Sequence, residues 1–540
     1  MEEVRRSGNF EASVWDDDYI QSLTSPYTGN KYVGEVEKLK NQVEIMIDET
    51  ADEADQLELI NNLQRLGLCN HFKDRIAKML DNISKAEDDE YMEKDLHVTA
   101  LKFRLLRQSG YHVPQEVFCS FMDDVGNFKA SVCEDVRGVV SLYEASYLSM
   151  EGESILDLAK DFSLNNLSGR IDQIREADVA EQVRHALEVP LHWRVERLEV
   201  IWFVEAYESR SDANLTLLEL AKLAFNVLQA THQQELKLIS RWSEETGLAE
   251  KLGFARHRLA ECFLWSLGFV PEPHLGESRE IMTKAAVLVT LLDDIYDIYG
   301  TFEELRLFTH TVERWDINSL DSLPEYMRIF FLALFNSANE LAYRIMRDQG
   351  PNIISNMRRM WVDLCKAYYL EAIWFHSGYV PTTEEYLSTA WVSISGPLIL
   401  VYGYLSTNPI NKKELLSLEQ HPGIIRWPSM IFRLTDDLGT SSDEMKRGDV
   451  PKIVECYMKE TGCSEEDARK HVKHLMEAAF KRMNKEILME KPLKNYGLTA
   501  MNLGRMSFCM YQYGDGFGIP HSQTKKNLVS LLVRPMPSIS

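Results

Sequence analysis

Apolar side chains recur along most of the chain at spacings of three and four residues, the rhythm of one face of an α-helix. In the segment 215–236 they fall at Leu217, Leu220, Ala221, Ala224, Phe225 and Leu228. The segments 56–72 and 97–113 show the same spacing. No sustained alternation of apolar and polar residues, the mark of a half-buried strand, occurs. The pattern therefore predicts an all-α protein.

Composition agrees with this prediction and divides the chain. Of the 540 residues only 27 are glycine and 17 are proline, so helix breakers are scarce, and 45% are apolar, enough for a large core. A polar break, YESRSDAN, precedes the long helical pattern that starts at residue 215. We therefore expect a boundary near residue 212 between two helical domains, 1–211 and 212–540.

Charge and cysteine content narrow the class of protein. The formal net charge of −24 argues against a nucleic-acid surface, and an anionic substrate needs cations to hold it. The eight cysteines are scattered without a CxxC pair, as in an intracellular protein with reduced thiols. The apolar runs are far shorter than the ~20 residues of a membrane span. The start, MEEVRRSGNF, lacks the features of a signal or transit peptide, so we expect a cytosolic protein or one whose targeting segment was removed.

Three acidic residues follow an apolar run in the segment VLVTLLDDIYDIYG. Asp293 and Asp297 are four residues apart and share one helix face, whereas Asp294 is turned about 100° away. Burying a carboxylate costs several kcal/mol unless it is paired or holds a metal ion. A solvated helix face is the alternative. The apolar run favours a buried helix whose paired carboxylates line a cavity and suit Mg²⁺ or Mn²⁺.

A second polar cluster lies in FRLTDDLGTSSDEMKRGDVPK. Asp436, Thr440 and Glu444 are spaced by four residues, so their oxygens share one stripe of a helix and form a plausible Mg²⁺ ligand set. Asp437 lies off the stripe and is expected to form a hydrogen bond or salt bridge. Gly448 is expected to end the helix. An ordinary polar helix face remains the alternative.

The segment KLGFARHRLAECFLW adds cations to the two acidic clusters. Arg256 and Arg258 offer forked donors for phosphate oxygens, and Trp265 lies on the helix face of Arg258. A surface arginine pair beside a core tryptophan is the alternative. Together the three features are what a diphosphate needs, and aromatic faces stabilise a cation by roughly 0.5–2 kcal/mol each. The candidate wall of such a cavity, which can equally be ordinary core, is Trp265, Tyr296, Phe432 and Tyr511.

These motifs, in this order and spacing, resemble those of the plant class I terpene synthases over essentially the whole chain. LLDDIYDIYGTFEELRLFT resembles the DDxxD helix of that family, RLTDDLGTSSDEMKRGD its (N/D)DxxSTxxxE motif and FARHRLAECFLW its RxR helix. RRSGNFEASVW matches RRx₈W through Arg5, Arg6 and Trp15. This last pattern points to the monoterpene branch, which uses geranyl diphosphate.

The resemblance implies a catalytic C-terminal α-bundle and an N-terminal relic α-barrel. It implies that three Mg²⁺ ions, or Mn²⁺, are bound by Asp293, Asp297, Asp436, Thr440 and Glu444. It implies that the diphosphate lies next to these acidic residues and is bound by Arg256, Arg258, Arg433 and Lys452. Other catalytic positions that it implies are Asp294, Trp265, Tyr511 and Asp515. Asp294 is expected to pair with a base such as Arg433, and Arg5, Arg6 and Trp15 are expected to belong to a lid.

The implied reaction is the metal-dependent ionisation of geranyl diphosphate, which gives a C10 olefin or alcohol through a carbocation. A sesquiterpene synthase that uses farnesyl diphosphate shares the metal residues and is the main alternative. A chain-elongating prenyltransferase carries two DDxxD motifs, which argues against that class. An isoprene synthase narrows its pocket with a phenylalanine where this chain has Ala286, so a roomier cavity is expected here.

Two further alternatives are weaker. A helical scaffold with incidental acids predicts neither metal dependence nor diphosphate affinity. An HD-type phosphohydrolase needs paired histidine and aspartate ligands, and His471 and His474 have no supporting acid in that pattern. The expected partner is a prenyl diphosphate, with no nucleic acid and no membrane span, for a monomer or homodimer. The resemblance implies a plastid stroma location with the transit peptide absent from this chain, or alternatively the cytoplasm, and it does not identify the product.

Overall fold

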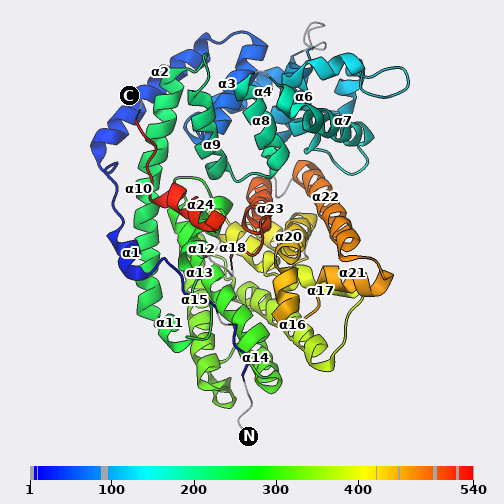
Figure 1. The fold of residues 1–540 in the computed structure, drawn as a ribbon. Coiled ribbons are helices and arrows are strands. Elements are labelled where there is room, and N and C mark those ends of the chain that lie inside the picture. The colour runs from blue at the N-terminus through cyan, green and yellow to red at the C-terminus, as the bar shows by residue number, and fades with distance from the viewer. Residues whose placement is uncertain are drawn as a thin grey trace. The chain divides into compact units, whose positions relative to one another are not determined.

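The structure, a computed structural model, describes residues 5–8, 10–86, 95–174, 176–420, 422–447, 450–489, 496–517 and 522–538. Helices make up 77% of the chain (Figure 1). Within the described ranges no β-strand occurs, and Met122 and Phe128 form an isolated bridge. The prediction of an all-α protein is confirmed.

The chain forms two compact units. The N-terminal unit consists of Ser25–Thr231, Lys481–Lys494 and Ser530–Ser540. The C-terminal unit consists of Met1–Thr24, His232–Phe480 and Asn495–Val529. The beginning of the chain therefore belongs with the C-terminal unit, which no composition shift in the sequence indicates. The domain boundary expected near residue 212 stays a prediction.

The helices of the N-terminal unit follow the amphipathic pattern read from the sequence. They are α2 (Asn30–Glu49), α3 (Glu53–Arg65), α4 (Lys73–Lys85), α5 (Leu96–Gln108), α6 (Val136–Ser146), α7 (Ser154–Arg170), α8 (Ala177–Glu188) and α9 (Glu196–Glu208). Helix α6 packs against both α5 and α7, and their apolar faces share one core. In this core Phe103 and Phe118 are fully buried, with ring centroids 5.1 Å apart.

Helix α10 (Leu215–Thr246) confirms the helix predicted over 215–236. On its apolar face Leu217, Leu220, Ala221 and Phe225 are buried, and Ala224 and Leu228 are half-buried. The remaining helices are α1 (Asp17–Ser22), α11 (Leu248–Lys251), α12 (Leu259–Phe269), α13 (Gly276–Asp294), α14 (Phe302–Arg314), α15 (Glu325–Gln349), α16 (Ile354–Ser377), α17 (Thr383–Ser393), α18 (Gly396–Thr407), α19 (Lys412–Glu419), α20 (Gly423–Arg447), α21 (Ile453–Thr461), α22 (Glu465–Met489), α23 (Gly497–Tyr511) and α24 (Ser522–Leu532).

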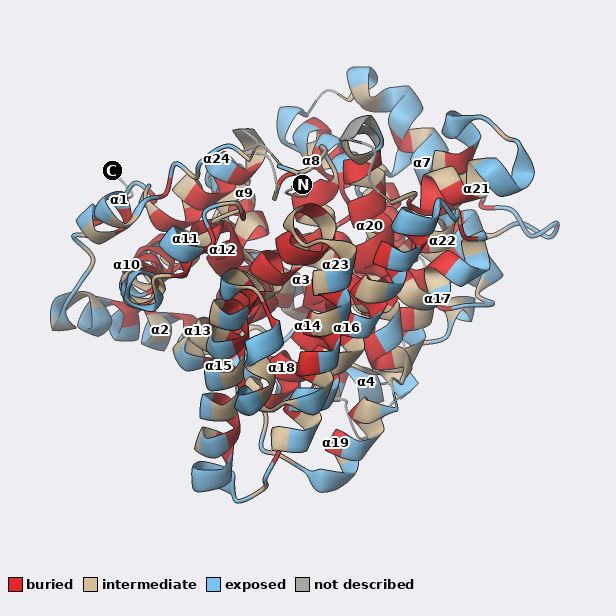
Figure 2. Cartoon of the chain, turned by 90° about the horizontal axis from the view of Figure 1, so that it is seen from below, coloured by how far each residue is buried: buried red, intermediate tan, exposed pale blue. Residues whose placement is uncertain are grey.

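Helix packing in the C-terminal unit brings together the helices that carry the polar motifs. Helix α13 packs against α12 and α18, α20 packs against α23, and α14 packs against α16. Every residue of α18 from Gly396 to Leu405 is buried, so this helix is central. Figure 2 shows α14, α15 and α16 with buried residues on one side and exposed residues on the other. The predicted helix end at Gly448 lies outside the described residues.

In the described part of the chain, one stretch is long and apolar enough to cross a membrane by length and composition alone, Thr383–Thr407. It consists of α17 and α18, and 72% of its most apolar window is buried inside the protein. Between the two helices Ser395 has a φ of +66°, which breaks the helical path. A buried, interrupted segment of this kind is weak evidence for a membrane span.

Candidate active site

The C-terminal unit contains a cavity with a volume of about 540 Å³, within the usual range for small-molecule sites. Its lining comes from α12, α13, α16, α17, α18, α20 and α23, from turns and loops beside these helices, and from the N-terminal segment, which we define as residues 5–8 and 10–15. Most of the site residues expected from the sequence line this cavity, namely Arg256, Trp265, Asp293, Asp294, Asp297, Arg433, Asp436, Thr440, Glu444, Lys452, Tyr511 and Asp515.

Asp293 and Asp297, which form the first acidic bank, reach the cavity where α13 ends. The expected regular α-helical spacing is wrong here, because α13 stops at Asp294 and Ile295–Tyr299 form a π-helical turn. The hydrogen bond that closes this turn runs from the N–H of Gly300 to the carbonyl of Ile295 at 2.8 Å. Both carboxylates line the cavity despite the wider turn. A π-turn within a helical segment is frequent at functional sites.

Asp294 is fully buried and pairs with Arg256. The backbone N–H of Arg256 donates to Oδ2 of Asp294 at 2.6 Å, and its Nε donates to Oδ1 at 3.0 Å. Nη2 of the same guanidinium donates to Asp293. The expected pairing of Asp294 with a basic residue is therefore correct, but the partner is Arg256 and not Arg433. Burial raises the pKa of Asp294, and the attraction of Arg256 opposes this rise.

The second acidic bank lies along α20, where Asp436, Thr440 and Glu444 all line the cavity. Within the described chain, Oγ1 of Thr440 and Oε2 of Glu444 are buried and make no hydrogen bond of standard geometry, although the Thr440 hydroxyl is near enough to Glu444 to lower the pKa of that carboxyl slightly. Burial raises the pKa of Asp436 against the attraction of Arg433, and burial raises the pKa of Glu444 against that of Lys452. Buried oxygens without hydrogen bonds of standard geometry, beside crowded carboxylates, are suited to a cation.

The two banks together fit divalent metal ions. Their donors are carboxylate and hydroxyl oxygens, which Mg²⁺ and Mn²⁺ prefer. Among the described residues, no three acidic, histidine or cysteine side chains converge closely enough to hold an ion by themselves. Mg²⁺ usually keeps several waters and takes further oxygens from substrate phosphates, so one or two carboxylates per ion suffice. The assignment of individual ligands stays a prediction.

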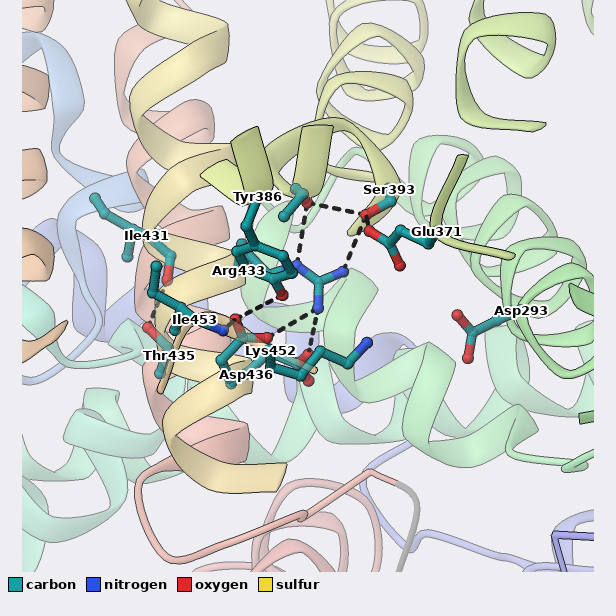
Figure 3. Close-up of polar contacts among 12 residues, drawn as sticks. Asp293, Glu371, Tyr386, Ser393, Ile431, Arg433, Thr435, Asp436, Lys452 and Ile453 are labelled. Atoms are coloured by element: carbon teal, nitrogen blue, oxygen red, sulfur yellow. Dashed lines mark hydrogen bonds and ion pairs between the residues drawn. The ribbon is translucent and has the colours of Figure 1, made fainter. Parts of the chain in front are cut away.

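Arg433 is buried, and Figure 3 shows its guanidinium next to Asp436 of the second bank. Its Nη1 donates to Asp437 at 3.0 Å and to Asp436 at 3.2 Å, and its Nε donates to the carbonyl of Ala390 at 3.1 Å. Asp437 also accepts a hydrogen bond of 2.7 Å from the hydroxyl of Tyr386. Asp437 therefore forms the salt bridge expected for it, and it fixes the guanidinium next to Asp436.

Lys452 and Glu371 add two more buried charges to the cavity lining. Burial lowers the pKa of Lys452, but the attraction of Glu444 and Glu371 outweighs burial and leaves the pKa above its ordinary value. Glu371 accepts a hydrogen bond from the hydroxyl of Ser393. Sequence reasoning missed Glu371 and Tyr368, which also lines the cavity. The one available signal was a carboxylate three residues after a tyrosine in the mainly apolar run AYYLEAIWF.

Aromatic and aliphatic side chains line the rest of the cavity. The ring centroids of Trp265 and Phe432 are 4.9 Å apart, and Tyr511 lies 6.4 Å from each. Tyr296, the fourth aromatic residue expected in the wall, instead packs as core against Tyr368, with centroids 5.3 Å apart. The aliphatic lining residues are Met282, Ala286, Val289, Ile298, Ile394, Ile399 and Leu503.

The N-terminal segment is fastened to the first acidic bank. Both terminal nitrogens of Arg5 donate to Glu304 at 2.8 Å, and Arg5 also donates to the carbonyl of Tyr299 at 3.0 Å. Arg6 donates to the carbonyl of Asp297 at 2.9 Å. Trp15 is 5% exposed. These contacts do not fit a frayed tail, and the two carbonyls belong to the π-turn that carries Asp297.

The aromatic ring of Phe10 completes the cover over the first bank. It lies 4.9 Å from the guanidinium carbon of Arg256, within reach of a cation–π contact, and it lines the cavity. Sequence reasoning did not single out Phe10, although it lies inside the RRx₈W match. The lid role of the segment stays a prediction.

Comparison with known families decides the identity of this site. The model described as "Terpene synthase, N-terminal domain" matches residues 14–187, and that described as "Terpene synthase family, metal binding domain" matches residues 244–482. The chain belongs to the terpene synthase family. As a terpene synthase it is a lyase that acts on a prenyl diphosphate.

Individual relatives match the chain along its whole length. It is 70% identical to exo-alpha-bergamotene synthase of Lavandula angustifolia over 99% of both chains, and 61% identical to alpha-zingiberene synthase of Ocimum basilicum over 99% of both chains. It is 52% identical to (-)-alpha-terpineol synthase of Vitis vinifera, over 99% of this chain and 92% of the relative.

Solved structures of other terpene synthases have the same fold. A limonene synthase with 2-fluorolinalyl diphosphate superposes with a TM-score of 0.96 at 42% identity, over 99% of this chain and 100% of the other. Isoprene synthase from grey poplar, in complex with three Mg²⁺ ions and dimethylallyl-S-thiolodiphosphate, has a TM-score of 0.90 at 43% identity, over 98% and 100%. These likenesses support the use of divalent metal by this terpene synthase.

Replacing Trp265 by leucine tests whether the aromatic wall contacts the reacting hydrocarbon. Trp265→Leu is expected to change the product mixture, because it removes one cation-stabilising face next to Phe432 and Tyr511. Gas chromatography of the products measures this change. Unaltered products together with a lower melting temperature would show that Trp265 acts only in packing.

Proposed function

We propose that this terpene synthase ionises farnesyl diphosphate and converts it into a C15 hydrocarbon through a carbocation. The observation that carries the proposal is a single cavity that joins two acidic banks and buried cations to an aromatic and aliphatic wall. The relatives at 70% and 61% identity, whose names denote sesquiterpenes, support the C15 chain. This substrate replaces geranyl diphosphate as the first candidate.

Geranyl diphosphate remains a second candidate because of one specific feature. The RRx₈W match through Arg5, Arg6 and Trp15 is typical of the monoterpene branch, and Gly8, Phe10 and Glu11 of the segment that carries it line the cavity. The alpha-terpineol synthase relative at 52% identity supports the same substrate. A cavity of about 540 Å³ accommodates either chain. A plastid location stays a prediction.

Different residues of the cavity have different roles in the proposed reaction. Arg256 is half-buried and Lys452 is buried, and both line the cavity, where they can bind diphosphate oxygens. Asp437 holds Arg433 in place. When bound at the two acidic banks, Mg²⁺ neutralises the diphosphate and makes it a better leaving group. Trp265, Phe432 and Tyr511 line the cavity, where their aromatic rings can stabilise the cation. The N-terminal segment excludes water from it.

Calorimetric titration separates this function from a helical scaffold with incidental acids. We expect the thiolodiphosphate analogues of farnesyl and geranyl diphosphate, which resist ionisation, to bind only when Mg²⁺ is present. The farnesyl analogue should bind more tightly, because its longer chain buries more apolar surface. Binding that is independent of Mg²⁺, or no binding at all, contradicts the proposed site.

Deleting residues 1–14 tests the role of the N-terminal segment. If the main product is cyclic, the deletion should impair turnover of geranyl diphosphate more than turnover of linalyl diphosphate, because the trans double bond must isomerise before a six-membered ring can close. If the product is acyclic, the deletion should raise the alcohol fraction, because water enters the cavity. Unchanged rates and an unchanged alcohol fraction would show a passive tail.

A further inference from the structure

We propose that Arg258 is a positioning residue that ties two cavity-lining segments together, and that it does not bind the substrate diphosphate. The first is the N-terminal segment, and the second is the C-terminal loop that follows α23 and includes Phe517. The proposal deepens the proposed function and rests on it, because the cavity that the two segments border is the one in which the diphosphate ionises.

Two donors of Arg258 are directed to backbone carbonyls of the two segments, and a third, Nη1, is directed to the carbonyl of the neighbouring His257 at 3.4 Å. Its Nη2 donates to the carbonyl of Glu11 at 2.8 Å, and its Nε donates to the carbonyl of Phe517 at 3.2 Å. Glu11 and Phe517 line the cavity, whereas Arg258 is 3% exposed and is not among the described residues of the lining. Arg258 therefore lies behind the segments that border the cavity.

The neighbouring arginine of the RxR motif is placed differently. Arg256 lines the cavity and donates to Asp293 and Asp294. Arg258 is the residue that precedes the first turn of α12, and its backbone, with φ −124° and ψ 47°, is not helical. The two arginines of the motif thus have different roles. Arg256 contacts the first acidic bank, whereas Arg258 contacts the two segments that border the cavity.

Only a guanidinium can make both contacts with one side chain. Its planar fork presents donors in different directions, so it reaches carbonyls of two chain segments at once. Hydrogen bonds from a charged donor are stronger than neutral ones. A lysine at this position keeps the positive charge but offers a single nitrogen, which is not expected to span both carbonyls.

Arg258 completes the attachment of the N-terminal segment. Arg5 and Arg6 hold one end of it on carbonyls of the π-turn, and Arg258 holds the carbonyl of Glu11 five residues after Arg6. Phe10, which covers Arg256, lies between these anchor points. Without Arg258 the C-terminal half of the segment loses its tie to the Phe517 loop, so water gains access to the carbocation.

Glutamyl endopeptidase provides a direct readout of this attachment, because it cleaves after Glu11, whose side chain is exposed while its carbonyl is held. We expect Arg258→Lys and Arg258→Met to raise the rate of cleavage at Glu11 by about tenfold or more, since cleavage requires local release of the segment. Mass spectrometry of the released N-terminal peptide measures the rate. The control is Arg306→Met, an exposed arginine paired with Glu303, which should cleave like the parent chain.

Calorimetric titration with inorganic pyrophosphate and Mg²⁺ shows whether Arg258 acts as a positioning residue or binds the diphosphate. A lost diphosphate contact weakens binding by about tenfold or more. We expect Arg258→Lys to bind pyrophosphate as the parent chain does, and to give a higher alcohol fraction from farnesyl or geranyl diphosphate. If Arg258→Met does not keep its helical circular dichroism, the lysine variant alone decides, because it keeps the charge and the aliphatic stem.

Parent-like cleavage at Glu11 in the lysine variant overturns the proposal. Weaker pyrophosphate binding by the methionine variant, with parent-like binding and products in the lysine variant, also overturns it and makes Arg258 a diphosphate ligand. The cleavage assay needs neither metal nor turnover, so its failure is distinct from a failure of the proposed function.

In a chain that lacks residues 1–14, Arg258→Lys should raise the alcohol fraction little further, because one attachment point is already gone.

Discussion

Replacing Asp293 by alanine is expected to lower turnover by about 10³-fold or more, because the first acidic bank then keeps one carboxylate of its pair. The fold should persist, since Arg256 retains its hydrogen bonds to the buried Asp294. Steady-state kinetics and the helical circular dichroism of the same sample measure the two expectations.

The matched control for this variant is Glu303→Ala. Glu303 is an acidic residue on α14 whose side chain is 69% exposed, and it does not line the cavity. Its removal should leave turnover near that of the parent chain. Near-parental turnover of Asp293→Ala itself would contradict the assignment of Asp293 to the metal site.

Replacing Arg433 by methionine is expected to destabilise the C-terminal unit by about 3–5 kcal/mol, because it leaves the buried Asp437 without its charged partner. For a unit of this size, a loss of about 3–5 kcal/mol corresponds to a fall in melting temperature of roughly 5–8 °C. Differential scanning calorimetry measures the transition. Arg306→Met, which removes an exposed partner of Glu303, should shift it by little.

A double variant tests the cause of this destabilisation. In Arg433→Met with Asp437→Leu no uncompensated carboxylate remains at position 437, so part of the lost stability should return. If the double variant is as unstable as the sum of the two single changes, the buried pair is not the reason for the loss.

The periodicity of the apolar residues predicted most of the fold, and the spacing of the acidic residues predicted most of the candidate site. Apolar periodicity found α3, α5 and α10 because burial of one helix face is a local property of the sequence. The spacing of Asp436, Thr440 and Glu444 found one stripe of α20 for the same reason. The roles of these oxygens as metal ligands are not tested by geometry alone.

Other features depended on contacts that no local pattern records. The π-turn after Asp294 depends on where α13 stops, and two carbonyls of this turn accept hydrogen bonds from Arg5 and Arg6, about 290 residues earlier in the chain. Tyr296 and Tyr368 stack on each other, and only the packing of α16 decides that Tyr368 faces the cavity.

The arginines show the same limit of sequence reasoning. The sequence predicted a basic partner such as Arg433 for Asp294, whereas tertiary packing places the backbone N–H and the guanidinium of Arg256 against it. Arg258 belongs to the motif that indicated diphosphate binding, yet its donors reach carbonyls of residues 11 and 517. Motif spacing indicates which residues approach the site, whereas the direction of each side chain follows from tertiary packing.

Product analysis with two substrates tests the central claim most directly. The chain is incubated with farnesyl diphosphate or geranyl diphosphate, with Mg²⁺ or with a chelator, and the products are separated by gas chromatography with mass detection. We expect a C15 hydrocarbon from farnesyl diphosphate only when Mg²⁺ is present, with a kcat/KM higher than that for geranyl diphosphate. A higher kcat/KM for geranyl diphosphate would contradict the proposed substrate, and products that form equally in the chelator would contradict a metal-dependent ionisation at this cavity.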